Sequence, residues 1–597
     1  MRSPPPHIGL LLLGGAALFA GSFAADSQPA GPSPYLIDLH LHGSLSERAG
    51  TMANHVNEAV AAGYDGLWWT DHMERTFSAA FVHRVRFEGN LDGEPRAGGA
   101  LPNGSFTLAE SAPGISALNF RSDNPLEGSS YARLEVNTES GADWSTASLD
   151  YGSRQLTHRI SLFAAPHLRV HLRTRRAQGE TGAIVRAVFS SKPDGISREG
   201  IPFVLEYFAP ESVLPPPGEN TVRVPVVGLP EHGWGEADLD LAADAFAAWP
   251  SGPDLGLRDL SIVLHARQGG ERELDLDDFR MELEGATDLD LLRAQRDFVR
   301  QNYSQSLFHE VGMEIAGPDD PLDEADADHL ISLFPGDIPE LLYLTAGSQQ
   351  SLDYPQSGVD WIQSRGGVAI LAHVFGPVLP PEEVSPAVAS ERAQRILAAR
   401  AWGADAVEVG YPLRGRPLAA HVQVWDELSA ARVYVTGVGV SDNHTVQPWP
   451  LFTNRMGSWL RAPSSAAPDL CAAVKAGDVF FGDAHLFSPT GDFLLDEAGE
   501  AFRMGDVVPT APRTVFFRAR VTGARPGDFF VMLHNGAEIG RGSGFTGTGG
   551  QAVMPIAIEA GDWVRVEIRG PGEQPILFAN PIYFVGPGEQ IPPHRRP

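Results

Sequence analysis

Residues 35–46 read YLIDLHLHGSLS, and the two histidines in this stretch decide how the fold is interpreted. An apolar run leads to His40 and His42, which are separated by a single leucine. Because side chains alternate along a β-strand, residues two positions apart share one face, so both imidazoles would point the same way at the end of a strand. Such a pair is either part of a metal site or a coincidence, and an isolated HxH favours coincidence. A metal site therefore requires further ligands elsewhere in the sequence.

The same stretch begins a strand–helix–strand pattern. Residues 51–65, TMANHVNEAVAAGYD, have apolar side chains at helical spacing, which predicts an amphipathic helix. Residues 66–72, GLWWTDH, indicate a second buried strand that ends in polar side chains. Strands and helices alternate again from about residue 291. This succession indicates a parallel α/β arrangement, either a sheet or a barrel.

Between the two α/β segments the sequence changes character. From 81 to 290 it consists mainly of short alternating runs separated by turns rich in Gly, Pro, Asn and Asp, which is typical of an antiparallel β-sandwich. The closing run LDLDDFRMEL at 274–283 is similar to the last strand of jelly-roll carbohydrate-binding modules. Residues 500–590 are again strand-like and predict a second, smaller sandwich.

The simplest organisation is one α/β domain that a sandwich interrupts. The α/β domain covers 35–80 and 291–495, the inserted sandwich covers 81–290, and the C-terminal sandwich covers 500–590. The interruption follows WWTDH, where a strand-to-helix loop of a barrel would lie. Such surface loops tolerate long insertions, so the barrel could accommodate the sandwich at this point of the chain.

Charge and cysteine content exclude several classes of site. The formal net charge of -30 argues against a nucleic-acid surface, which requires clustered Lys and Arg. Cys471 is the only cysteine, so no intrachain disulfide can form, and we expect it to be a small buried residue. Any metal must therefore be bound by His, Asp and Glu, a ligand set that suits Zn, Mn or Fe.

Residues 1–25 have the pattern of a signal peptide. Arg2 precedes a short apolar core, and small residues lead to a cleavage point near Ala24. The alternative is an uncleaved membrane anchor, but the apolar core is short for a spanning helix of about 20 residues. We therefore expect an exported protein, periplasmic or secreted, with no membrane attachment after cleavage.

Further ligand-type residues lie at the ends of the expected strands. They are His40 and His42, Asp71 and His72, Glu314, His329, His373, and Asp442 and His444. In parallel α/β folds the functional site lies at the carboxyl ends of the strands, so these side chains are expected to converge. Each motif alone is weak in a chain with 19 histidines. Their shared position after apolar strands predicts a metal site.

The motifs DLHLHGS, GYDGLWWTDH, VGMEI, LAHVFGP and GVGVSDNH follow one another in this order. Together they resemble the PHP family, which is named for its polymerase and histidinol phosphatase members, over about 35–75 and 295–490. An exported PHP domain with added β modules also resembles the carbaryl-hydrolase-like branch. The resemblance implies a distorted (β/α)7 barrel that holds two or three divalent metals.

The resemblance also assigns roles to individual residues. It implies that His40, His42, Glu314 and Asp442 bind a first metal and that Glu314 bridges to a second. Asp71 would not be a ligand, and would instead orient a ligand or a loop.

The remaining implied ligands complete two further metal positions. His329 and His373 would complete the second metal. His72 and His444 would hold a third metal together with an acidic residue or histidine soon after the HxH motif. Glu47 is the nearest carboxylate to that position in GSLSERAG.

The expected function is that of an exported phosphoesterase. Clustered divalent cations polarise a phosphoryl or carbonyl oxygen and lower the pKa of bound water to about 7, so that a hydroxide can attack. Glu314, Asp442 and His444 are the expected catalytic residues. The substrate would be a small-molecule or glycan-linked phosphoester or ester. The alternatives are a hydrolase of carboxylic or carbamate esters on the same metals, and a glycan-binding protein with a vestigial PHP domain.

Four residues outside this ligand set also carry expectations. Glu408 ends the strand DAVEVGYP and is interpreted either as pocket-lining or as structural. His55 lies on the first helix and is expected to be exposed. At least one of Trp68 and Trp69 is expected to lie in the core.

Overall fold

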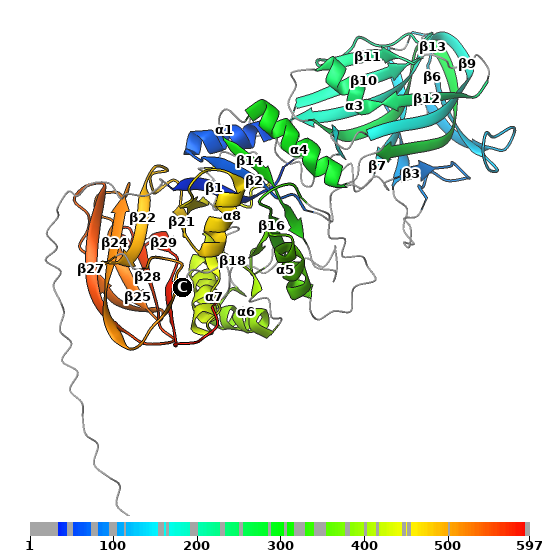
Figure 1. Ribbon diagram of the computed structural model, residues 1–597. Helices are drawn as coiled ribbons and strands as arrows, with labels where there is room; N and C mark the ends of the chain where they lie inside the picture. Colours follow the sequence, from blue (N-terminus) through cyan, green and yellow to red (C-terminus); the bar gives the residue numbers. More distant parts are fainter. Residues whose placement is uncertain are drawn as a thin grey trace, which may run out of the picture.

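The computed structural model shows an α/β region and two regions built from strands (Figure 1). The described residues are 34–591 except for 44–51, 73–81, 95–103, 113–114, 142, 153–159, 163–165, 192–200, 210, 227–232, 250–254, 284–287, 304–306, 316–328, 339–353, 376–382, 399–402, 413–416, 445–448, 450–454 and 500–501. The signal-peptide prediction for 1–25 lies outside the described residues. Among the described helices, none has the length and apolar character that crossing a bilayer requires.

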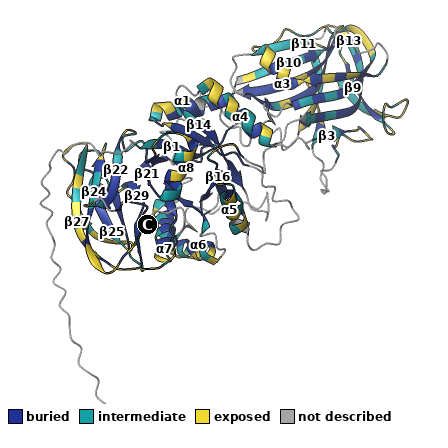
Figure 2. Cartoon of the chain, in the orientation of Figure 1, coloured by how far each residue is buried: buried dark blue, intermediate teal, exposed yellow. Residues whose placement is uncertain are grey.

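The α/β region alternates strands and helices. Its elements are β1 (Tyr35–Leu41), α1 (Met52–Ala62), β2 (Gly66–Trp69), α4 (Asp288–Tyr303), β14 (Phe308–Val311), β15 (Met313–Ile315), β16 (Leu330–Leu333), α5 (Tyr354–Ser364), β17 (Val368–Leu371), α6 (Pro386–Ala398), β18 (Ala406–Gly410), α7 (Leu418–Ala430), β19 (Thr436–Gly439), β20 (Met456–Leu460), α8 (Ala467–Ala476) and β21 (Val479–Asp483). Strands β14, β2 and β1 are parallel neighbours in one sheet, and β17, β18 and β19 are parallel neighbours in another. Figure 2 shows that the strands of this region are mostly buried, whereas its helices are exposed on their outer faces.

Two isolated bridges join these sheets close to the strand ends. One links His72, after β2, to Glu314 of β15, and the other links Leu41 to Asn443, after β19. The chain passes from the first sheet to the second at Gly312, between β14 and β15. A Cβ at Gly312 would lie 2.2 Å from a backbone carbonyl oxygen of the second sheet, so only glycine fits there. The bridges bring the ends of β1, β2, β15 and β19 together.

Strand β16 runs against both of its neighbours. It is antiparallel to β15 and to β17. His329 precedes β16, whereas His72 and His373 follow the strands β2 and β17. Because β16 is reversed, its amino end lies at the same edge as the carboxyl ends of the parallel strands. The reversal therefore brings His329 to that edge.

Strand β1 contains a local irregularity that places apolar side chains and histidine side chains on the interior side of the strand. Ile37 and Leu39 belong to an apolar cluster with side chains of β16, β17, β18 and β19, and strict alternation would turn His40 and His42 to the opposite face. The ladder between β1 and β2 shifts register after Asp38, as at a β-bulge. Across this shift, Ile37 and Leu39 lie in the apolar cluster while His40 faces Glu314 and His42 faces Asp442.

Burial tests three of the sequence expectations. Trp68 and Trp69 are both fully buried, which confirms that the second strand contributes to the core. Cys471 is also buried, as expected, on α8. The expectation for His55 is wrong, since this residue is buried on α1 and its ring contacts the rings of Trp69 and Trp449.

In its described residues, the inserted region is a β-sandwich with one short helix. Its elements are β3 (Val82–Val85), β4 (Ser105–Glu110), β5 (Ser116–Arg121), β6 (Tyr131–Asn137), β7 (Ser145–Gly152), β8 (Ile160–Ser161), β9 (Pro166–Ser191), β10 (Ile201–Phe208), β11 (Thr221–Pro225), β12 (Gly235–Asp240), α3 (Leu241–Ala248) and β13 (Gly256–Leu283). The long strands β9 and β13 pair with each other, and the first half of β13 also pairs with β7 whereas its second half pairs with β6. The two long strands therefore contribute to both layers.

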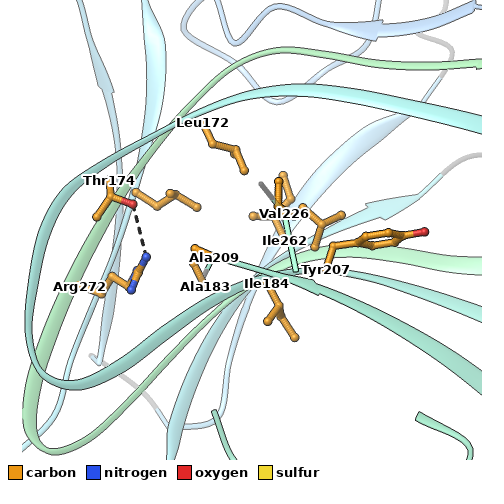
Figure 3. Close-up of a pocket in the computed structure, with 11 residues that line it drawn as sticks. Leu172, Thr174, Ala183, Ile184, Tyr207, Ala209, Val226, Ile262 and Arg272 are labelled. Atoms are coloured by element: carbon orange, nitrogen blue, oxygen red, sulfur yellow. Dashed lines mark hydrogen bonds between the residues drawn. The ribbon is translucent and has the colours of Figure 1, made fainter. Parts of the chain in front are cut away.

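One charged side chain lies in the apolar interior of this sandwich. Arg272 is 1% exposed and lines a small cavity with apolar side chains such as Leu172 and Ile262 (Figure 3). Its Nη2 donates to Thr174 Oγ1 at 3.3 Å and to Glu211 Oε1 at 2.8 Å. Burial lowers the pKa of Arg272, because an apolar interior disfavours the charged form.

The C-terminal region continues a sheet of the α/β region. Its strands are β22 (Asp492–Glu497), β23 (Val507–Pro509), β24 (Arg513–Thr522), β25 (Phe529–His534), β26 (Ala537–Arg541), β27 (Gly549–Ile558), β28 (Trp563–Arg569), β29 (Pro575–Ala579) and β30 (Ile582–Val585). Strand β29 pairs with β21, while β22, β24 and β27 form a separate layer. Asn580 connects to Gly437 N, Gly437 O and Val479 O with bonds of 2.7–2.9 Å. The two regions thus share a continuous hydrogen-bonded ladder.

Candidate metal centre

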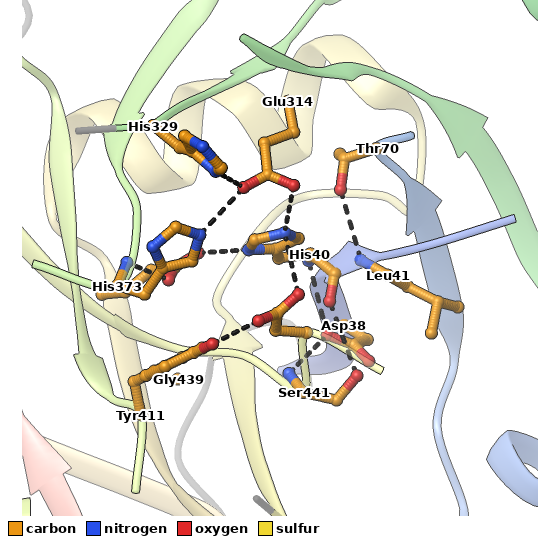
Figure 4. Close-up of polar contacts among 12 residues, drawn as sticks. Asp38, His40, Leu41, Thr70, Glu314, His329, His373, Tyr411, Gly439 and Ser441 are labelled. Carbon is orange, nitrogen blue, oxygen red and sulfur yellow. Dashed lines mark hydrogen bonds and ion pairs between the residues drawn. The ribbon is translucent and has the colours of Figure 1, made fainter. Parts of the chain in front are cut away.

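The described ligand-type side chains lie together at one edge of the two sheets, and Figure 4 shows His40, Glu314, His329 and His373 among them. They are His40 in β1, His42 after it, His72 after β2, Glu314 in β15, His329 before β16, His373 after β17, and Asp442 and His444 after β19. All are buried except His444, whose side chain is 20% exposed. Glu47, the acidic candidate for a third metal, lies outside the described residues.

Glu314 lies at the centre of this group, and its two oxygens face different imidazoles. Oε1 is 2.9 Å from His373 Nε2 and also contacts His329 Nδ1. Oε2 lies 3.0–3.3 Å from ring nitrogens of His40, His42 and His72. One carboxylate therefore spans two groups of imidazoles, which is the arrangement that a bridging ligand requires.

The donor atoms on the Oε2 side have the spacing of a coordination sphere. His40 Nε2 lies 3.2 Å from His42 Nε2, and Asp442 Oδ1 lies 3.3 Å from the first nitrogen and 3.1 Å from the second. Metal–nitrogen bonds of about 2.0–2.1 Å at tetrahedral angles separate neighbouring donors by roughly 3.3 Å. Imidazole and carboxylate donors at these separations fit a divalent metal ion.

Three overlapping sets of potential ligands occur among the described residues. They are His40–His42–Glu314, His72–Glu314–His329 and His42–His72–His444. The first set, with Asp442, matches the ligands expected for the first metal. The second places His72 beside Glu314 as well as beside His444, so His72 is not restricted to the third position. The last set contains three imidazoles and no carboxylate.

Glu408, at the end of β18, contacts two of the histidines. Its Oε1 lies 2.6 Å from His40 Nδ1, and its Oε2 accepts a hydrogen bond of 2.7 Å from the backbone N–H of His373. Glu408 is fully buried. The sequence left open whether Glu408 is pocket-lining or structural. Its burial and its contacts with His40 and His373 favour the structural role.

Asp442 is held on both sides. Its Oδ2 accepts a hydrogen bond from Tyr411 Oη, which leaves Oδ1 facing His40 and His42. The backbone N–H of Asp442 donates to His40 O at 2.9 Å, so the end of β19 is tied directly to β1. Asp442 has φ of 47°, in the left-handed region that non-glycine residues rarely adopt. Such strain persists only where surrounding contacts fix it, and it is frequent at functional sites.

Asp71 connects the loop after β1 to the helix that follows the insertion. Its Oδ1 accepts from Gly43 N at 3.1 Å, and its Oδ2 accepts from Gln295 Nε2, on α4, at 2.7 Å. A Cβ at Gly43 would lie 2.7–2.9 Å from atoms of Gln295 and Asp71, so the loop approaches α4 closely. These contacts agree with the expected role of Asp71 in orienting a loop.

The electrostatics favour ionised carboxylates among imidazoles. Burial alone would raise the pKa of Glu314, but the imidazoles of His72, His329 and His40 hold it well below its usual range. The pKa of His444 is held well below its usual range by burial and by His42. Burial opposes protonation of His40 too, yet Glu408, Asp442 and Glu314 raise its pKa well above the usual range. A cation bound among these carboxylates would compete with that proton.

Sequence reasoning missed the contacts of Tyr411 and Gln295. Tyr411 lies three residues after Glu408 in the same motif, EVGYP, so the strand-end position was a usable signal. Gln295 lies within a helix, and nothing in its local sequence indicates that it meets Asp71.

No protein-family model matches this chain, and no curated protein matches it. Solved structures show similarity to its parts. A carbohydrate-binding module of the β-sandwich superfamily is 15% identical over 30% of this chain, which spans only 56% of that chain, with a TM-score of 0.19. A family 11 carbohydrate-binding module from Clostridium thermocellum is 10% identical over 34% of this chain and 97% of that chain, with a TM-score of 0.20.

A third structure matches a larger share of the chain. It is a two-domain protein from Bacteroides vulgatus that contains a predicted PHP-like metal-dependent phosphoesterase; it is 12% identical over 49% of this chain and 79% of that chain, with a TM-score of 0.22. At such identities and TM-scores these similarities assign neither a family nor an activity. The geometry of the candidate metal centre is therefore the basis for a functional interpretation.

Proposed function

We propose that this protein is a metal-dependent hydrolase of the PHP type and that it acts as a phosphoesterase outside the cytoplasm. The observation that carries the proposal is the position of Glu314, whose two oxygens face separate groups of imidazoles. The strand order supports a distorted (β/α)7 barrel, because β1, β2, β14–β15, β16, β17, β18 and β19 follow one another and isolated bridges connect the sheets. The reversed β16 is the main distortion.

The chain would hold the metals through donors on several strands. His40, His42 and Asp442 would bind one ion, His329 and His373 a second, and Glu314 would bridge them. When bound, such ions polarise a phosphoryl or carbonyl oxygen and lower the pKa of a bound water.

His444 and His72 would bind a third ion or face the substrate. His444 is the most exposed member of the group and is neutral at neutral pH because its pKa is lowered by burial and by His42. It can therefore act as a ligand or accept a proton. Asp442, whose pKa is held well below its usual range against the effect of burial by His444 and His40, would remain an ionised ligand.

Metal analysis combined with turnover tests this proposal. We expect the purified protein to retain about two or three equivalents of Zn, Mn or Fe and to hydrolyse p-nitrophenyl phosphate or bis-p-nitrophenyl phosphate. Turnover of p-nitrophenyl acetate alone would instead favour the carboxylic or carbamate ester hydrolase. Protein that holds no divalent metal, and that stays inactive after addition of Mn or Zn, would exclude both enzymes.

A groove on the inserted sandwich favours a second candidate function, glycan binding. It measures about 570 Å³ and crosses β7, β13, β9, β10 and β11. Its lining includes Asp150, Asp259, Arg186, Arg258 and Ser261. Carboxylates, guanidinium groups and hydroxyls together can donate and accept the hydrogen bonds that sugar hydroxyls require.

Affinity electrophoresis of the full chain in gels that contain soluble polysaccharides tests glycan binding. We expect retardation by at least one polysaccharide, and we expect Arg186→Ala to reduce it because the guanidinium would be lost from the groove. Arg176→Ala, at an exposed position outside the groove, is the matched control. Unchanged mobility of wild-type protein in every gel would reject this second function.

A further inference from the structure

We propose that Glu408 is a positioning residue that couples two metal positions of the proposed hydrolase. The inference rests on the proposed function and deepens it. Glu408 contacts His40 at Nδ1 and His373 at the backbone N–H, whereas the Nε2 atoms of both rings face Glu314. Its two oxygens thus hold His40 and His373, which belong to different ions in the proposed centre.

The contact with His40 fixes the state of the ring. Histidine has two ring nitrogens, and a carboxylate that accepts the Nδ1 proton leaves Nε2 as the donor atom for a metal. Glu408 Oε1 lies 2.6 Å from His40 Nδ1, and His40 Nε2 faces Glu314 Oε2 at 3.3 Å. The same carboxylate makes the imidazole a stronger ligand, because its negative charge favours positive charge on the ring.

The contact with His373 acts through the backbone. His373 has φ of 21°, at the edge of the left-handed region, and its N–H donates to Glu408 Oε2. The ring's Nδ1 has no hydrogen-bond partner among the described residues. The turn therefore sets the direction of the ring, whose Nε2 lies 2.9 Å from Glu314 Oε1. By accepting this hydrogen bond, Glu408 stabilises the turn that presents His373 to the proposed second ion.

Both partners of Glu408 are N–H donors, so the residue must provide two acceptors. A glutamine offers one acceptor oxygen and one NH2 group, and the NH2 group would face an N–H. An aspartate keeps the charge but withdraws both oxygens by one methylene. Neither replacement can hold His40 and His373 together, although neither removes a ligand.

Chelator competition on the full chain tests the coupling. Metal content is measured after dialysis against graded concentrations of dipicolinate for wild type, Glu408→Gln and Glu408→Asp. We expect both variants to lose two metal equivalents at chelator concentrations about 10–100-fold lower than wild type, the usual effect of removing an outer partner of a ligand. Glu310→Gln, a buried carboxylate of β14 paired with Arg300, is the control and should release metal as wild type does.

The outcomes separate this inference from the proposed function. Wild-type retention of metal with equal retention by both variants would overturn the coupling role alone. Loss of only one equivalent would also overturn it, because Glu408 would then serve a single ion. Wild-type protein without divalent metal would overturn the proposed function and this inference together. Because Glu408→Asp preserves the buried charge, it keeps the test decisive if Glu408→Gln fails to fold.

Discussion

Glu314→Gln is expected to abolish metal binding and hydrolysis together while the protein stays folded. The amide keeps the shape of the side chain, but it removes the negative charge and replaces one acceptor oxygen with an NH2 group. Because each oxygen of Glu314 faces a different group of imidazoles, the substitution disturbs both groups. We expect kcat/KM to fall more than about 100-fold, beyond the loss typical of an outer partner.

The measurement combines metal content, turnover of the nitrophenyl ester that wild type hydrolyses, and far-UV circular dichroism. Glu310→Gln serves again as the control, because it removes a buried carboxylate outside the centre. Full activity and metal content in Glu314→Gln would contradict the bridging role. A variant that unfolds would show instead that the carboxylate is needed for the fold.

Stability is expected to fall as the pH drops from about 6.5 to about 4, with His309 as a main contributor. Burial lowers the pKa of His309 from 6.5 to about 4. The unfolded chain then binds a proton near pH 6.5 that the folded chain binds only near pH 4, so the contribution is complete above pH 6.5 and is lost as the pH falls toward 4. A shift of this size corresponds to about 3 kcal/mol in the free energy of unfolding.

His309→Gln isolates this contribution from that of other groups. Glutamine does not titrate and can still accept the hydrogen bond that Trp69 Nε1 donates to His309 Nδ1. The free energies of unfolding of wild type and variant are measured in urea at pH 7 and pH 4. We expect the difference between them to change by about 3 kcal/mol in favour of the variant at the lower pH. A constant difference would show that His309 titrates normally in the folded protein.

The ligand-type residues could be predicted because metal chemistry restricts residue type. His, Asp and Glu at the ends of apolar strands stand out locally, and the structure brings the described ones together around Glu314. The fully buried Trp68 and Trp69 likewise follow from an uninterrupted apolar strand. Such features need only the neighbouring sequence, since period and polarity determine which face is buried.

Other parts of the site depend on pairings that leave no local signal. Glu408 and His40 are 368 residues apart, and only the closed arrangement of strands brings them together. The direction of β16 also has no signature, because four consecutive buried residues, Leu330–Leu333, are compatible with either orientation. The shift in β1 is a backbone irregularity, so alternation predicted that His40 and His42 share a face but not that Ile37 and Leu39 share the interior with them.

The ladder between β21 and β29 joins the C-terminal region to the α/β region, although the sequence suggests two separate domains. If the C-terminal strands were removed, β21 would become an edge whose N–H and C=O groups have lost their partner, and every residue of that strand is buried in the intact protein. Open apolar edges recruit other chains, so the truncated protein would tend to aggregate. We therefore expect the α/β region and the C-terminal region to unfold together in one transition, because the two regions share this ladder.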